Sequence, residues 1–270
     1  MKIVHLSDLH AGASANTVKI HKKFFADHAQ EINDSDVMVL AGDSISTSQH
    51  QFKTLFRTIR ELCPDIVILC VNGNHDYWGQ AKNPRWTPTL EDILEEQEGY
   101  FQEFKIHHLQ RHGSVDFPNH GIKFWGFDGW YHHANPETND SKWMRTCWQT
   151  EYGGVRPFDY LTKKAYETFD QILVDSADYQ GKKVMVTHMP PMSMAPPDET
   201  WSFYGTTYSA QETQYMHRGI RSMLEPIAEN FDWCLMGHFH SFYDLIIERC
   251  RFRTTGCNYD KPVMNTIDIY

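Results

Sequence analysis

Seven side chains of the kinds that bind transition metals follow short apolar segments of the sequence. In chain order they are Asp8, His10, Asp43, Asn74, His188, His238 and His240. Carboxylate and amide oxygens, together with imidazole nitrogens, are typical ligands of Mn²⁺, Fe and Zn²⁺. Asp8 and His10 are two residues apart, as are His238 and His240, so each pair points to one side of an extended segment. The pattern predicts that these side chains converge on one site.

Seven ligands are more than one ion takes, which favours two ions that share a bridging ligand. Asp43 suits the bridging position because a carboxylate has two oxygens and because a glycine precedes it at the end of an apolar segment. The amide of Asn74 is neutral, so it would keep the site from becoming too negative. We therefore predict two divalent or trivalent ions, with Mn²⁺, Fe and Zn²⁺ as the candidates.

The elements that must position these residues are six apolar segments with the character of buried strands. They are "KIVHLSDLH" (2–10), "DVMVLAGD" (36–43), "DIVILCVNGNHD" (65–76), "GIKFWGFDG" (121–129), "KKVMVTHMPP" (182–191) and "DWCLMGHFH" (232–240). Helical periodicity is clear at 48–62, 89–98, 159–178 and 219–229. Thr89, followed by Asp92, resembles a capping box.

Strands that alternate with helices predict an α/β layered fold, in which ligands bind at the carboxyl ends of the strands. After residue 240 the segments "DLIIERCRFRTTG" and "NTIDIY" predict a meander of antiparallel strands. A lone D-x-H, "GD" or "GNHD" is common in simple turns. Five strand ends that all carry ligand types indicate a shared site.

The composition limits the classes of protein to which the chain can belong. Its 270 residues suit a single domain, 1–270, with aromatic loop insertions near 128–160 and 192–217. A formal charge of −10 disfavours non-specific binding to nucleic acid or to an anionic membrane. No apolar stretch approaches the roughly 20 residues of a membrane helix, and no signal peptide is visible, so we expect a cytoplasmic protein. Among the six cysteines, Cys250 and Cys257 could face each other across a hairpin, although a reduced pair is favoured.

The ordered motifs "SDLH", "AGD", "GNHD", "VTHMPP" and "GHFH" resemble those of the calcineurin-like metallophosphoesterase superfamily, over residues 6–240. The resemblance implies a four-layer α/β/β/α fold, a β-sandwich flanked by helices. It implies hydrolysis of phosphate esters by a hydroxide that bridges two metals. It also implies that one metal is bound by Asp8, His10, Asp43 and His240, and the other by Asp43, Asn74, His188 and His238.

The resemblance places His75 at the substrate phosphate or the leaving oxygen. A protonated His75 could neutralise charge on that oxygen as a general acid. Asp76 could orient His75, or it could simply cap the segment that follows. Family members often carry Asp or Asn three residues after the bridging Asp, whereas this chain carries Ser46. This departure puts one hydrogen bond near the site in doubt, but no metal ligand.

Several alternatives stay open at the level of substrate. The motifs lean towards phosphodiesterases, and the runners-up are a DNA-repair-type nuclease, disfavoured by the acidic charge, and a phosphomonoesterase or protein phosphatase. A non-catalytic scaffold on the same fold is disfavoured because the seven ligand positions and His75 are all present. An amidohydrolase is disfavoured because its H-x-H comes at the first strand, whereas here it comes last.

The aromatic loops bear on the same question. Trp130 and Trp201 could belong to a wall that stacks on a base or another apolar leaving group, which would make a nucleotide a candidate substrate. They could equally pack against the core or a subunit interface.

Overall fold

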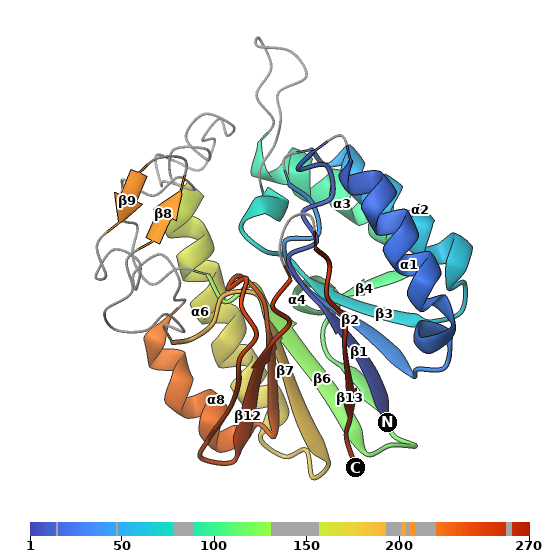
Figure 1. Cartoon of the computed structure of the whole chain (residues 1–270). Helices are drawn as coiled ribbons and strands as arrows, with labels where there is room; N and C mark the ends of the chain where they lie inside the picture. The colour runs from blue at the N-terminus through green and yellow to red at the C-terminus, as the bar shows by residue number, and fades with distance from the viewer. Residues whose placement is uncertain are drawn as a thin grey trace.

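The computed structural model describes residues 1–14, 16–46, 48–77, 89–130, 157–192, 201–203, 206–208, 220–257 and 261–270. Two β-sheets lie face to face, and helices cover the outer face of each sheet (Figure 1). The expected four-layer α/β/β/α sandwich is therefore confirmed.

The first sheet has five strands in the order β13-β1-β2-β3-β4. Strands β1 to β4 are parallel, whereas β13 is antiparallel to β1. The strands are β1 (Lys2–Leu6), β2 (Val37–Ala41), β3 (Val67–Val71), β4 (Ile106–His108) and β13 (Asn265–Asp268). The prediction that "NTIDIY" continues the meander is wrong, because this segment pairs with β1. There Ile267 and Ile269 are buried in the same cluster as Ile3.

The second sheet has six strands in the order β11-β12-β10-β7-β6-β5. Its central strands are parallel, and β11 and β5 are antiparallel at the two edges. The strands are β5 (Val115–Phe117), β6 (Ile122–Phe127), β7 (Lys182–Thr187), β10 (Trp233–Met236), β11 (Asp244–Ile247) and β12 (Cys250–Thr254). The antiparallel hairpin predicted after residue 240 is confirmed as β11 and β12. A separate small sheet pairs β8 (Trp201–Phe203) with β9 (Thr206–Tyr208).

Helices α1 and α2 cover the first sheet, and α6 and α8 cover the second (Figure 1). The helices are α1 (Thr17–Asn33), α2 (His50–Leu62), α3 (Leu90–Glu103), α4 (Leu109–His112), α6 (Pro157–Ser176) and α8 (Leu224–Asn230), with short 3₁₀ turns η1 (His75–Tyr77) and η2 (Arg221–Met223). The capping box of α3 is confirmed. Asp92 N–H donates to the Thr89 hydroxyl at 3.1 Å, and Thr89 N–H donates to the Asp92 carboxylate at 2.8 Å.

Alternation along β1 shows how the layers are built. Val4 and Leu6 face the helices of the first sheet, whereas Ile3 faces the second sheet. Both faces of a central parallel strand are buried in this way, which explains why the predicted strands are continuous apolar runs. The packing fixes the two sheets against each other, and the carboxyl ends of β1, β2, β3, β7 and β10 meet at one end of the sandwich.

Some predictions fall on other parts of the chain. Most of the aromatic segments near 128–160 and 192–217 lies outside the described residues, as does Cys147. Cys250 and Cys257 are both buried, and no disulfide joins them, as the sequence favoured. No helix in the described part of the chain is long and apolar enough to cross a bilayer.

His5 is a polar residue inside this apolar arrangement. It alternates with Val4 and Leu6 on β1, so its ring points towards the second sheet, and it is fully buried. Burial, aided by the positive charge of Arg253, lowers the pKa of His5 to about 3. The folded protein therefore keeps this imidazole neutral, whereas the unfolded chain protonates it below pH 6.5.

We predict that His5 makes the protein less stable as the pH falls from 6.5 towards 3. Because only the unfolded chain gains a proton there, the free energy of unfolding should fall by about 1.4 kcal/mol per pH unit from this residue alone. Urea unfolding of the chelator-treated protein measures this slope. His5→Leu should have a shallower slope than the wild type. Equal slopes for wild type and His5→Leu would contradict the prediction.

Candidate metal centre

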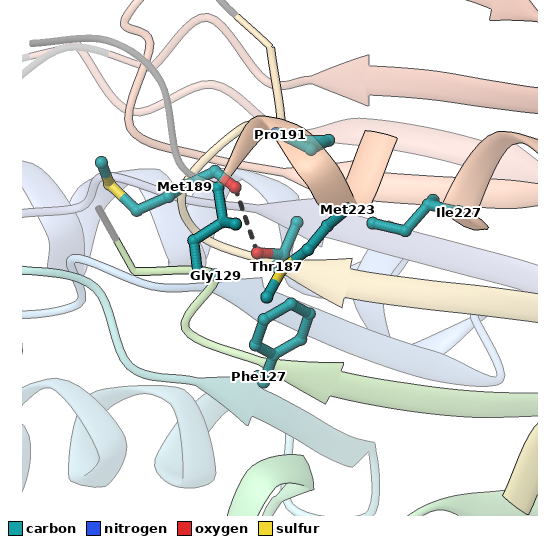
Figure 2. A pocket seen from close by; sticks show the side chains of 8 residues that line it. Phe127, Gly129, Thr187, Met189, Pro191, Met223 and Ile227 are labelled. Atoms are coloured by element: carbon teal, nitrogen blue, oxygen red, sulfur yellow. Dashed lines mark hydrogen bonds between the residues drawn. The ribbon is translucent and has the colours of Figure 1, made fainter. Parts of the chain in front are cut away.

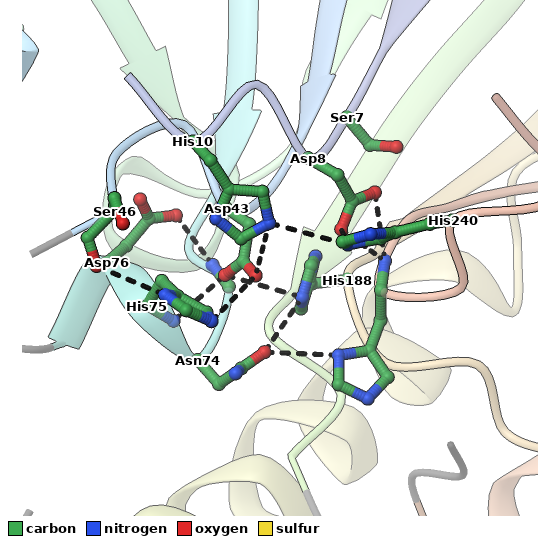
Figure 3. Close-up of polar contacts among 12 residues, drawn as sticks. Ser7, Asp8, His10, Asp43, Ser46, Asn74, His75, Asp76, His188 and His240 are labelled. Atoms are coloured by element: carbon green, nitrogen blue, oxygen red, sulfur yellow. Dashed lines mark hydrogen bonds and ion pairs between the residues drawn. The ribbon is translucent and has the colours of Figure 1, made fainter. Parts of the chain in front are cut away.

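The predicted ligands come together where the two sheets meet (Figure 3). Figure 3 shows the side chains of Asp8, His10, Asp43, Asn74, His188 and His240 pointing towards one another from several different strands. Asp8, His10, Asp43, Asn74 and His188 are buried, and His238 and His240 are partly exposed. The exposed edge gives a ligand access to an otherwise closed cluster.

Tight backbone turns direct these side chains inward. Asp8, His10, Asp43 and His238 all have positive φ angles, of 52°, 45°, 50° and 66°. This left-handed conformation costs about 1–3 kcal/mol for a residue other than glycine, although Asp and His tolerate it better than most. Gly42 has φ 81°, and a Cβ there would overlap the ring of His188. The strain and the close packing both occur where the strands end at the cluster.

One group of donor atoms surrounds His10. Its Nε2 lies 3.4 Å from His240 Nε2 and 3.5 Å from Asp43 Oδ2. His240 Nε2 is also 3.4 Å from Asp8 Oδ1. Ligands bound at about 2.1 Å to one ion are roughly 3.0–3.5 Å from each other. The donors of this group are therefore spaced as the ligands of a single cation are.

A second group surrounds Asn74. Its Oδ1 lies 3.0 Å from His188 Nε2 and 3.1 Å from His238 Nδ1. His188 Nε2 is also 3.4 Å from Asp43 Oδ1. Asp43 thus belongs to both groups, and each of its two carboxylate oxygens faces a different one.

The chemistry of these donors fits a cation. His188 Nδ1 lies 2.9 Å from the carbonyl oxygen of Ala41, so Nδ1 must carry the hydrogen. In the neutral ring Nε2 then presents a lone pair to the oxygens of Asn74 and Asp43, which present lone pairs as well. A metal ion resolves this repulsion, and a backbone carbonyl that orients a histidine ligand in this way is common at metal sites.

The pKa values of the donor residues reflect the same demand for a cation. Burial would lower the pKa of His188, but the Asp43 carboxylate outweighs burial and raises it to about 10. Burial would raise the pKa of Asp8, but the hydrogen bond and the charge of His240 lower it to about 2. The carboxylates of the cluster therefore favour a positive charge at this position.

His75 lies at the edge of the first group. Its Nδ1 donates to the carbonyl oxygen of Ser46 at 3.1 Å, and its Nε2 lies 4.0 Å from Asp43 Oδ2. The ring is 13% exposed and packs edge-on against His10. Ser46 therefore contacts His75 through its backbone carbonyl and not through its side chain. The Nε2 atom of His75 faces the cluster, within reach of a metal or of a bound substrate.

Asp76 has partners other than the one suggested by the sequence. The carboxylate is fully buried and accepts hydrogen bonds from Ile45 N–H at 3.0 Å and Gly73 N–H at 2.7 Å. Burial, followed by the nearby Asp43, raises its pKa to about 7. Asp76 therefore connects two loops, and the Ser46 carbonyl orients His75.

Comparison with known proteins decides the family. The family model described as calcineurin-like phosphoesterase matches residues 1–242. The chain belongs to this family. No curated protein sequence matches it. This phosphoesterase is therefore a metal-dependent hydrolase of phosphate esters.

One solved structure supports the fold. The crystal structure of phosphopantetheinyl hydrolase from Mycobacterium tuberculosis is similar to this phosphoesterase, with a TM-score of 0.66 and 15% sequence identity. The match covers 98% of this chain and 95% of that one. A predicted phosphoesterase from Streptococcus pneumoniae gives a TM-score of 0.34 at 12% identity, over 99% of this chain and 83% of that one.

Sequence reasoning missed Asp128. Asp128 is 1% exposed and accepts hydrogen bonds from the Tyr77 hydroxyl at 2.8 Å and Trp130 N–H at 3.4 Å. It ties the end of β6 to the turn that carries His75. Trp130 is fully buried and packs edge-on against Tyr77, so for this residue the packing alternative is confirmed. The side chain of Trp201 lies outside the description.

A small apolar pocket lies at the end of β7 (Figure 2). It contains about 160 Å³ of empty space between β6, β7 and the start of α8, but too little room for a water molecule. Among the described residues that line it, Thr187 alone has a polar side chain, and its hydroxyl donates to the carbonyl of Met189 at 3.1 Å. The described lining is thus mainly apolar, and we interpret the pocket as a gap in packing.

Gly73 provides a test of the metal centre in this phosphoesterase. A Cβ at Gly73 would overlap the Asp43 carboxylate, so Gly73→Ala must displace the group shared by the two donor clusters. Overpacking costs about 1–3 kcal/mol, equivalent to about 5–150-fold if the whole cost appears in metal affinity. Calorimetric titration with Mn²⁺ measures the loss.

Gly99→Ala is the matched control, because Gly99 lies in α3 with no atom within 4 Å of an added Cβ. It should bind metal normally and gain about 1 kcal/mol in stability from higher helix propensity. Normal metal affinity in Gly73→Ala would contradict the close approach of the two loops.

Proposed function

We propose that this phosphoesterase binds two metal ions per chain and hydrolyses phosphodiesters in preference to monoesters. The observation that carries the proposal is the position of Asp43, whose Oδ2 faces His10 and whose Oδ1 faces His188. A buried carboxylate in this position can bridge two ions. The diester preference rests on the motifs "GNHD", "THMPP" and "GHFH", which resemble phosphodiesterase and bacterial or phage-type branches of the family more than Ser/Thr protein phosphatases.

Each ion has its own set of ligands in this proposal. Asp8, His10 and His240 complete one site with Asp43, and Asn74, His188 and His238 complete the other. Nitrogen and oxygen donors of this mixture suit Mn²⁺, Fe or Zn²⁺. Two ions held together can activate a shared water and hold the phosphoryl oxygens of the substrate.

His75 is the residue that we assign to the leaving group. The Ser46 carbonyl fixes the hydrogen on Nδ1 and thereby turns Nε2 towards the cluster. In the imidazolium form both ring nitrogens carry a hydrogen. The hydrogen on Nε2 can then be donated to the oxygen that leaves phosphorus. The partial exposure of the ring is consistent with contact to a substrate that arrives from solvent.

We predict two metal ions per chain in protein purified without chelator and reconstituted with Mn²⁺. Elemental analysis measures the stoichiometry. Asp43→Asn should lose both metal and activity, because an amide has a single oxygen with which to bind. A wild-type stoichiometry that stays below one after reconstitution would rule out the dinuclear centre.

A panel of phosphomonoesters, phosphodiesters and cyclic nucleotides tests the substrate preference, and faster turnover of monoesters would contradict it.

We predict that His75→Asn retains both metals and loses about 10²–10⁴ in kcat, because the proton donor is gone while a polar group of moderate size remains. The loss should be smaller for nitrophenyl esters, whose leaving group needs less protonation. Elemental analysis and kinetics with good and poor leaving groups measure both effects. Loss of metal would show that His75 is itself a ligand, and equal losses for all leaving groups would exclude proton donation.

A further inference from the structure

Asp76 connects the two loops that carry Asp43 and Asn74. One loop follows β2 and contains Asp43 and Ile45, and the other follows β3 and contains Gly73 and Asn74. One carboxylate oxygen of Asp76 accepts from Ile45 N–H, and the other accepts from Gly73 N–H. A single buried carboxylate therefore satisfies a backbone donor on each loop.

The two loops also meet at Asp43 itself. His75 N–H donates to Asp43 Oδ1 at 2.9 Å, and Gly73 lies so close to the Asp43 carboxylate that it has no space for a Cβ. Asp43 Oδ1 is the oxygen that faces His188. A change in the separation of the loops therefore moves the oxygen that would serve the second ion.

Two buried side-chain amides bind the backbone of Asp76. Its carbonyl oxygen accepts from Gln49 Nε2 at 2.9 Å and from Gln97 Nε2 at 2.6 Å. Gln97 is fully buried, and its side-chain oxygen accepts from Asn72 and Arg111. Connected buried networks of this kind hold their members in one arrangement. Asp76 is thus fixed from both its side chain and its main chain.

We propose that Asp76 is a positioning residue that holds Asp43 in the bridging position between the two metal ions. This inference rests on the proposed dinuclear function. It places the action of Asp76 at the shared ligand and not at His75, whose ring the Ser46 carbonyl orients. It predicts that loss of the Asp76 carboxylate affects the second metal before it affects the fold.

Asp76→Asn tests this inference with little change in size. An amide has one acceptor oxygen, so it can satisfy only one of the two N–H groups and presents an NH₂ to the other. Leaving a buried donor unsatisfied corresponds to a loss of about tenfold or more. We expect Asp76→Asn to bind the second Mn²⁺ at least about tenfold more weakly and to lose kcat at limiting Mn²⁺.

Asp128→Asn is the matched control, because Asp128 is also a buried carboxylate with two hydrogen-bond donors, the Tyr77 hydroxyl and Trp130 N–H, but neither donor is a backbone N–H of the loops that carry Asp43 and Asn74. Asp76→Ser, which introduces a smaller side chain with a hydroxyl, provides a second variant if circular dichroism shows that Asp76→Asn does not fold. Electron paramagnetic resonance of the Mn²⁺-loaded protein reports whether two ions share a bridge. The coupled signal should be present in the wild type and in Asp128→Asn and lost in folded Asp76 variants at limiting Mn²⁺.

Wild-type coupling and affinity in both Asp76 variants would overturn the inference and leave the dinuclear function intact. Equal loss of coupling in Asp128→Asn would also overturn it, because any buried carboxylate near the turn would then have the same effect. A wild-type protein with a single uncoupled ion would overturn the proposed function and this inference together.

Discussion

The constraint on which the rest of this structure depends is the burial of the Asp43 carboxylate among histidines. A buried anion is stable only when hydrogen bonds and positive charge compensate for its lost hydration. Here the His75 N–H donates to one oxygen, and the rings of His10 and His188 approach from opposite sides. The pKa of Asp43 is held well below its usual range, despite burial, by the charges of His188 and His75. The strands and loops around Asp43 place the hydrogen-bond donors and histidine rings that stabilise its buried charge.

Two face-to-face sheets provide that arrangement. Parallel strands end at one edge of each sheet, and the apolar contacts between the sheets set those edges against each other. Short strained turns after β1, β2 and β10 then point the polar side chains inward. The ligands therefore sit on short connections anchored to rigid strands, an arrangement that favours precise placement. The cost of four left-handed residues is compensated by the packing of the whole sandwich.

Much of this could be predicted from the sequence, for identifiable reasons. Strands buried on both faces are continuous apolar runs, and α3 begins at a recognisable capping box, so both were visible. The pairing of β13 with β1 was not visible, because local pattern gives a strand but not its distant partner. Helix α1 was missed because its buried positions include Thr17 and His21, which weaken the apolar periodicity.

The convergence of the candidate ligands was predictable from the order of the strand ends, whereas the contacts that support them were not. The His75 ring donates to a backbone carbonyl, and because every residue has one, the sequence does not indicate which residue supplies it. Asp128 comes from a segment rich in aromatics, and it becomes important only because Tyr77 lies beside it in space. The role of Asp76 depends on two backbone N–H groups, one of them 31 residues away. Such contacts follow from the packed fold and leave no pattern along the chain.

The pairing of β1 with β13 has a consequence for how the protein comes to be folded. Met1 and Ile269 exchange hydrogen bonds across the edge of the first sheet, 268 residues apart. During translation β1 can pair with β2 early, but its other edge stays open until the last strand leaves the ribosome. An open edge next to an apolar face is a site for wrong pairing with other chains. The Cys257 thiol donates to the carbonyl oxygen of Asp8, and the Thr255 hydroxyl bonds to the Ser7 hydroxyl. Both residues are also synthesised late. The hydrogen bonds that support the loop carrying Asp8 therefore form only after residues 255 and 257 have been synthesised, and until then the open edge of β1 is exposed to wrong pairing.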